Sequence, residues 1–131
     1  MVAIKELIKT ADWKSEKHVP VIDGPEKIKK GDSVTVLVSV GKEIAHPNTT
    51  EHHIRWIELY FMTEGEKFPC QLGRFEFDAH GESVQGPNTS TIYAQPSISS
   101  VFKTDKSGFI LAVSYSKIHG LWENSKQLIV E

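Results

Sequence analysis

The sequence has little of what several protein classes require. Cys70 is the only cysteine, so no disulfide can form within the chain. No apolar run approaches the roughly 20 residues that a membrane-spanning helix needs. The first nine residues mix acidic and basic side chains where a signal peptide needs an apolar stretch. Basic residues are not in excess, since 17 acidic against 15 basic residues give a net charge of −2. We therefore expect a cytoplasmic chain that binds neither nucleic acid nor membrane.

Apolar residues follow the two-residue period of β-strands over much of the chain. Ser33–Val40 carries valine at every second position, the pattern of a half-buried strand. Further strand-like runs, separated by turn residues, occupy residues 54–62, 68–77, 91–94, 98–104, 109–115 and 127–130. Gly73 inside one of these runs indicates a β-bulge. Ile4, Leu7 and Ile8 predict one short amphipathic helix at the N-terminus.

These elements predict an all-β fold made of one domain. The 131 residues are enough to bury a core, and no linker or internal repeat divides residues 1–131. About seven short strands at this spacing are typical of an antiparallel β-sandwich. The short N-terminal helix would lie outside the two sheets.

Six histidines flank several of the expected strands: His18, His46, His52, His53, His80 and His119. Loops at one end of a sandwich can converge, so distant segments could supply one site. Neutral imidazole is a common ligand of iron, zinc, copper and nickel. Neighbouring strand residues point in opposite directions, so at most one of His52 and His53 should face a shared site. The spacings match no zinc-finger pattern, and a solvated or hydrogen-bonded loop side chain is the alternative interpretation for each histidine.

Four segments resemble one known family: Glu16–Ile22, Gly41–Ile57, Ala79–Val84 and Ile118–Trp122. Through them, nearly the whole chain resembles a single-iron superoxide reductase, also called neelaredoxin, and the catalytic domain of desulfoferrodoxin. The resemblance implies a seven-stranded immunoglobulin-like sandwich, often assembled as a homotetramer. It also implies one mononuclear non-haem iron per chain, which reduces superoxide to hydrogen peroxide, with rubredoxin as the usual electron donor.

The same resemblance assigns roles to individual residues. The positions that match the family's four equatorial iron ligands are His18, His46, His52 and His119. His53 and His80 match histidines that are not ligands. Lys17 matches the lysine that attracts superoxide. Glu16 matches a loop glutamate that can occupy the open iron position in the oxidised state.

The chain departs from the family at the axial ligand. The family has Cys-Asn-x-His where this sequence has Ser116-Lys117-Ile118-His119. A serine hydroxyl loses its proton far less readily than a thiol, so we expect Ser116 to bind a metal weakly or not at all. Cys70 has no histidine one turn away, and we expect it to be a small buried residue of its strand instead of a substitute ligand.

Three functions are therefore compatible with the sequence. The leading one is an oxidoreductase of the superoxide reductase family whose turnover is altered by the missing cysteine. The second is a metal-binding family member with a four-histidine site and little or no turnover, which could hold nickel, copper or zinc in place of iron. The third is a sandwich used only for interaction, for which the sequence has no positive sign.

Overall fold

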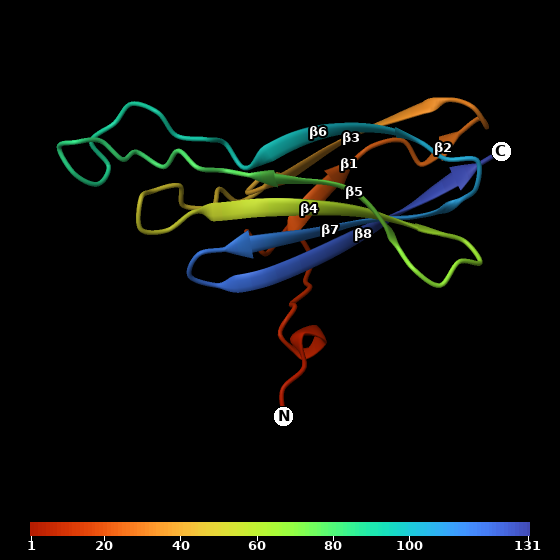
Figure 1. Cartoon of the computed structure of the whole chain (residues 1–131), viewed down its shortest axis with the longest axis horizontal. Helices are drawn as coiled ribbons and strands as arrows, with labels where there is room; N and C mark the ends of the chain where they lie inside the picture. Colours follow the sequence, from red (N-terminus) through yellow and green to blue (C-terminus); the bar gives the residue numbers. More distant parts are fainter.

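The computed structural model describes all of residues 1–131 and consists of two β-sheets packed face to face (Figure 1). One sheet has three strands in the order β1-β3-β6, and the other has five in the order β2-β8-β7-β4-β5. The strands are β1 (Pro20–Asp23), β2 (Lys27–Ile28), β3 (Ser33–Val40), β4 (Ile54–Thr63), β5 (Cys70–Glu76), β6 (Ser97–Lys103), β7 (Gly108–Ser116) and β8 (Gly120–Val130).

The core lies between the sheets and follows from the alternation seen in the sequence. Val34, Val36, Val38 and Val40 of β3 all point inward and are buried. They pack with inward residues of the five-stranded sheet into one cluster of 13 buried apolar side chains. Each fully buried aliphatic side chain of this kind contributes about 1.5–3 kcal/mol. Both sheets therefore depend on the same core, which holds their ends in register.

The all-β sandwich is confirmed, with four differences in its elements. The last strand, β8, begins at Gly120, whereas only residues 127–130 were predicted. The structure has eight strands, of which β1 and the two-residue β2 were not predicted. The short β2 runs parallel to β8. The predicted strand at residues 91–94 does not form, since its backbone bonds to the neighbouring loop and only Tyr93 makes an isolated bridge, to His80. The N-terminal helix is a single 3-10 turn, Ile4–Glu6. Such a short turn packs no apolar face, and Ile4 and Leu7 are exposed.

For β5, the strand that carries Cys70, the predicted bulge is confirmed and the predicted burial of the cysteine is wrong. The bulge near Gly73 is confirmed, because Leu59 pairs with Gly73 and Tyr60 with Gln71, which leaves one residue of β5 unpaired. Cys70, however, is exposed and not buried. It lies at the start of an edge strand, where no further strand covers it.

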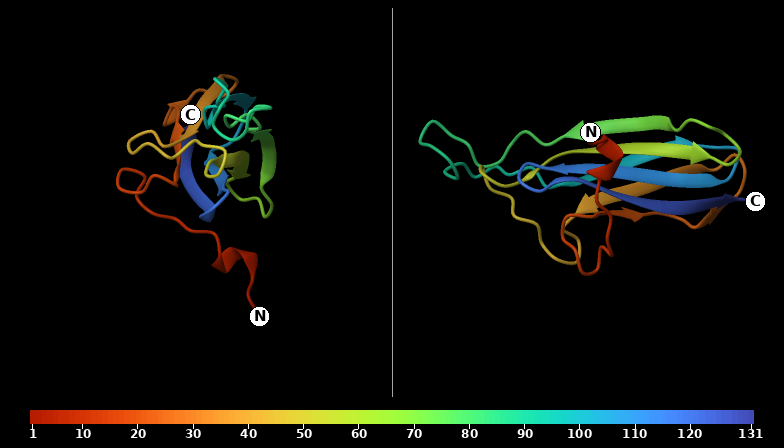
Figure 2. Two further views of the ribbon diagram at one scale, coloured as in Figure 1. Left: turned by 90° about the vertical axis from the view of Figure 1, so that its left-hand side faces the viewer. Right: turned by 90° about the horizontal axis from the view of Figure 1, so that it is seen from below.

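Four segments that carry histidines meet at one end of the sandwich. His18 lies two residues before the start of β1, residues 41–53 connect β3 to β4, and residues 117–119 connect β7 to β8. Register brings these ends together, because Pro20 pairs with Val40 and Ile54 with Ser116. The loop between β5 and β6 extends at the same end (Figures 1 and 2). The N-terminal segment projects from the sandwich, and its helical turn is far too short to cross a membrane.

Candidate metal centre

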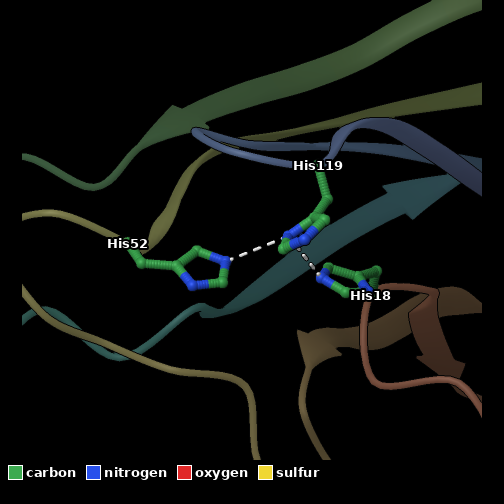
Figure 3. A group of neighbouring side chains, drawn as sticks. All are labelled: His18, His52 and His119. Atoms are coloured by element: carbon green, nitrogen blue, oxygen red, sulfur yellow. Dashed lines mark hydrogen bonds between the residues drawn. The ribbon is translucent and has the colours of Figure 1, made fainter.

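Three histidines from three separate segments form a compact cluster (Figure 3). One ring nitrogen of each of His18, His52 and His119 lies within 4.8 Å of the other two. His119 Nδ1 is 3.1 Å from His18 Nε2 and 3.2 Å from His52 Nε2. A single Nδ1 has one proton or one lone pair and cannot satisfy both neighbours by hydrogen bonds. A metal ion, by contrast, can accept lone pairs from all three nitrogens.

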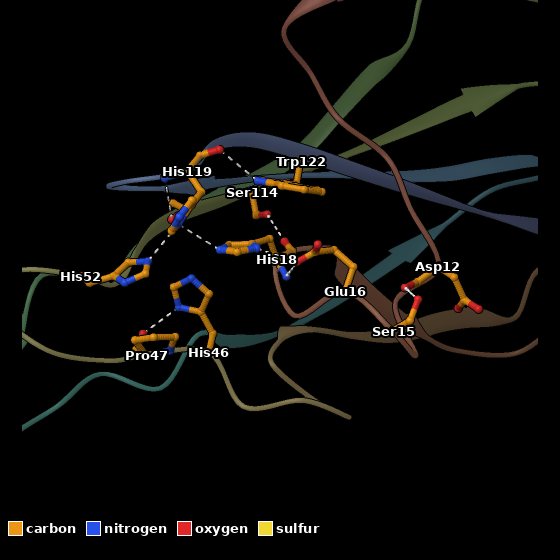
Figure 4. Close-up of polar contacts among 11 residues, drawn as sticks. Asp12, Ser15, Glu16, His18, His46, Pro47, His52, Ser114, His119 and Trp122 are labelled. Carbon is orange, nitrogen blue, oxygen red and sulfur yellow. Dashed lines mark hydrogen bonds and ion pairs between the residues drawn. The ribbon is translucent and has the colours of Figure 1, made fainter.

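His46 joins the cluster from the same loop as His52, the connection between β3 and β4 (Figure 4). Its ring centroid lies 4.9 Å from that of His18 and 4.8 Å from that of His52. Its Nδ1 donates a hydrogen bond to Pro47 O at 2.6 Å, so its Nε2 carries the lone pair. This Nε2 is buried and has no hydrogen-bond partner. Buried polar atoms are rarely left unpaired, so an unpaired acceptor beside three other imidazoles fits a metal ligand.

The His18 ring is held from two sides. Its Nδ1 donates to Glu16 Oε1 at 2.6 Å, which leaves Nε2 directed at the cluster. The Trp122 ring stacks on it, with centroids 5.1 Å apart and planes 16° from parallel. The backbone carbonyl of His18 accepts a hydrogen bond from Ser114 Oγ. A carboxylate on the second nitrogen of a ligand histidine fixes its tautomer and raises its basicity.

A closed turn orients His52. Thr49 N donates to His52 O at 2.9 Å, and His52 N donates to Thr49 Oγ1 at 3.1 Å. The next residue, His53, points away from the cluster and stacks on His80. Only one of these two neighbours therefore belongs to the cluster, as predicted, although both lie in the loop before β4 and not in a strand.

The tight turn between β7 and β8 carries His119 and Ser116. Gly120 has φ of 80° in this turn, a conformation that favours glycine. His119 N donates to Ser116 Oγ at 3.2 Å, and Trp122 Nε1 donates to His119 O at 3.1 Å. Ser116 itself is fully buried. The serine hydroxyl thus lies behind the exposed His119, bonded to its backbone.

Burial keeps most of the cluster neutral. It lowers the pKa of His46 to about 4. Burial likewise lowers the pKa values of His18 and His52, although the hydrogen bond with Glu16 opposes the effect at His18. These rings are neutral at pH 7, so a metal ion does not have to displace protons from them.

Glu16 is hydrogen-bonded to a histidine of the cluster, whereas Lys17 acts on the cluster through its charge. The hydrogen bond from the His18 ring lowers the pKa of Glu16, which stays ionised. Lys17 is partly buried and forms no ion pair with a carboxylate. Its charge contributes to the lowered pKa values of His18 and His46, so it acts on the cluster electrostatically.

Cys70 has no part in this site. It pairs with Phe61, seven residues along β4 from the Ile54 end where the cluster lies. Seven strand residues span about 23 Å. The only cysteine of this chain is therefore far from the histidines. The groups that support the histidines were not predicted from the sequence, above all Trp122, which lies only three residues after His119.

The fold and the site together define a β-sandwich protein with a multi-histidine metal centre at one end. Residues 10–125 match the desulfoferrodoxin family model. The chain is 61% identical over 125 residues to the superoxide reductase of Pyrococcus furiosus, covering 95% of this chain and 98% of that protein. It is 48% identical over 126 residues to the neelaredoxin of Megalodesulfovibrio gigas, covering 96% and 97%. The reduced superoxide reductase of Archaeoglobus fulgidus has a TM-score of 0.88 at 58% identity, covering 94% of this chain and 98% of that one.

This chain belongs to the superoxide reductase family, of the single-iron neelaredoxin type. Because the chain belongs to this family, iron is the metal whose fit to the four histidines matters. Their donor set fits it, because imidazole is a good ligand for iron and one buried nitrogen has no other partner.

Proposed function

We propose that the chain is a non-haem iron superoxide reductase that takes superoxide to hydrogen peroxide by one-electron reduction. The observation that carries the proposal is the convergence of His18, His46, His52 and His119, with the buried Nε2 of His46 unpaired. Relatives named superoxide reductase, at up to 61% identity over 125 residues, support the substrate. The test is superoxide consumption by the iron-loaded chain with reduced rubredoxin, the proposed electron donor.

The iron would be held by Nε2 of His18, His46 and His52 and by Nδ1 of His119. When bound, one iron per chain supplies the electron that superoxide accepts. Ser116 would add at most a weak neutral oxygen ligand, because its hydroxyl stays protonated and already accepts a hydrogen bond from His119 N. This difference at position 116 is the reason to expect turnover to differ from that of family members with cysteine there.

The surroundings of the cluster suit a small anionic substrate. His119 is exposed and His52 half-buried, so superoxide and water can reach this end of the sandwich. Superoxide takes up one electron and two protons to become hydrogen peroxide, and water at the open surface can deliver the protons. Lys17 would draw the anion toward the site through its unpaired positive charge.

Glu16 is the second proposed catalytic residue. Its carboxylate rests on His18 Nδ1 at 2.6 Å and on His18 N at 3.1 Å. From this position it orients His18, and it lies in the same loop as Lys17, beside the proposed substrate entry. We propose that the loop also lets Glu16 reach the open side of the centre in the oxidised state.

Replacing Lys17 with alanine should slow the reaction with superoxide roughly two- to fivefold at low ionic strength. The loss should shrink as salt is added, because screening already weakens the attraction in the parent. Stopped-flow rates across a salt series measure both effects.

Lys30→Ala is the matched control for this prediction. It removes the same charge from the turn between β2 and β3, beside the other end of the sandwich. Its rate should equal that of the parent. If Lys17→Ala also reacts at the parent rate at low salt, Lys17 is only a solvated surface charge.

Ser116 favours a second candidate function, a metal-binding protein without superoxide turnover. Without a thiolate, an all-imidazole site can hold nickel, copper or zinc as well as iron. Metal analysis combined with the turnover assay separates the two functions, since a chain that holds metal but consumes no superoxide fits only the second.

The cellular setting completes the proposal. We propose that residues 1–131 act as one cytoplasmic domain and assemble as a homotetramer. The shared core of both sheets supports the single domain. Size measurement by light scattering tests the assembly.

A further inference from the structure

A second pair of histidines lies behind the metal centre and takes no part in it. His53 and His80 are 5% and 3% exposed. Their rings stack with centroids 3.3 Å apart and planes 6° from parallel. His53 is the residue immediately before β4, and His80 lies in the loop between β5 and β6. Two buried imidazoles without metal are costly unless their nitrogens are satisfied, so their partners are informative.

His80 is bonded at both ring nitrogens. Its Nε2 contacts Phe77 O at 2.5 Å, and its Nδ1 contacts Asn48 Oδ1 at 3.3 Å. Asn48 Nδ2 donates to Ala94 O at 3.0 Å, which fixes Oδ1 as the atom that faces His80. Both ring nitrogens therefore face oxygen atoms, one in the segment after β5 and one in the loop between β3 and β4, so the ring links these two loops.

The backbone of His80 is anchored to the same loop. Thr50 Oγ1 donates to His80 O at 2.6 Å. Asn48 and Thr50 thus connect the long loop after β5 to the segment that lies between His46 and His52. A disturbance at His80 would be transmitted directly to that segment.

His53 ties two ligand-bearing segments together. Its Nδ1 donates to Thr49 O at 2.8 Å, which braces the turn that orients His52. Its carbonyl accepts the backbone N–H of Lys117 at 3.0 Å, which fixes the start of the turn that carries His119. The ring of His80 covers His53 on one face.

We propose that His53 and His80 act as one positioning unit that holds His46, His52 and His119 in the geometry required for metal binding. The inference rests on the proposed metal centre but not on turnover. Neither residue touches the metal site, so both are positioning residues. Outer partners of metal ligands typically contribute 10- to 100-fold to metal affinity.

The test is a double-mutant cycle in ferrous-ion affinity, measured anaerobically against a competing chelator. His53→Ala and His80→Ala should each weaken binding about tenfold. The double variant should lose little more than either single variant, because the two rings act through one stack. His80→Gln, which keeps an N–H donor but loses the stack, should lie between the parent and His80→Ala.

A spectroscopic signature distinguishes positioning from general destabilisation. With cupric ion as the probe, the nitrogen hyperfine pattern of the parent should change in His80→Ala. Leu128→Ala, which empties a buried core position on β8, is the control and should lower the thermal unfolding midpoint of the protein. It should leave the affinity and the hyperfine pattern unchanged.

Several outcomes would overturn the inference. Parent-like affinity in His80→Ala would do so, as would fully additive losses in the double variant or an equal loss in Leu128→Ala. A failure of the proposed function is seen separately, as a parent that binds iron but consumes no superoxide.

Amide hydrogen exchange of residues 46–53 in the metal-free protein adds a readout independent of metal. Exchange should accelerate in His80→Ala and stay unchanged in Leu128→Ala.

Discussion

Replacing Ser116 with cysteine is expected to give the ferric protein a visible sulfur-to-iron charge-transfer band that the parent lacks. A metal-bound thiol loses its proton and donates electron density, whereas the serine hydroxyl stays protonated. The thiolate should stabilise the ferric state and lower the reduction potential by at least about 60 mV, the shift for a tenfold change in the relative binding of the two oxidation states. Visible spectroscopy and redox titration measure the two effects.

The turn is already suited to an axial sulfur. Position 116 is fully buried, and His119 N, which now donates to Ser116 Oγ, would donate to the introduced sulfur. Ser114→Cys is the matched control, a buried serine two residues earlier on β7. It should give neither the band nor the shift. A Ser116→Cys protein with the parent's spectrum and potential would show that position 116 does not face the metal.

Replacing His119 with alanine should remove metal from the purified protein. Its Nδ1 lies 3.1 Å from His18 Nε2 and 3.2 Å from His52 Nε2, at the middle of the cluster. Losing a ligand should cost more than the roughly 100-fold upper range for outer partners. Its hydrogen bonds to Ser116 and Trp122 use backbone atoms, so alanine preserves the turn. Elemental analysis measures the metal content.

His80→Gln is the control for this prediction. His80 lies outside the ligand set, so this variant should still bind one iron per chain when iron is saturating, with only its affinity reduced. Equal metal content in His119→Ala and His80→Gln under these conditions would remove His119 from the ligand set.

The alternation of apolar and polar residues was enough to predict the strands that build the core. It did not predict strand segments that form only by pairing with residues elsewhere in the fold. The alternating valines of β3 need only a sheet and a core to be buried. Residues 123–127 of β8 are all polar, and the pairing of this part with β7 follows from the tight turn at Gly120. The residues at 91–94 have strand-like composition, yet the loop around them takes their hydrogen bonds.

For the site, too, the sequence revealed the identity of the residues but not how they contact one another. Resemblance supplied the four histidines, and the structure brings them together through strand register. Nothing in the sequence indicates that His46 Nε2 is unpaired or that Glu16 rests on His18, because both depend on the packing of separate loops. Cys70 was misplaced because an apolar run does not reveal which strand lies at a sheet edge.

X-ray absorption at the iron edge of the unmodified, iron-loaded protein tests the central claim most directly. We expect the iron to be surrounded by imidazole nitrogens with no sulfur neighbour, because the four histidines converge and Cys70 pairs with Phe61, far along β4 from them. A sulfur shell at roughly 2.3 Å, the usual zinc–thiolate distance, would contradict it. So would a shell without the multiple-scattering pattern of several imidazole rings.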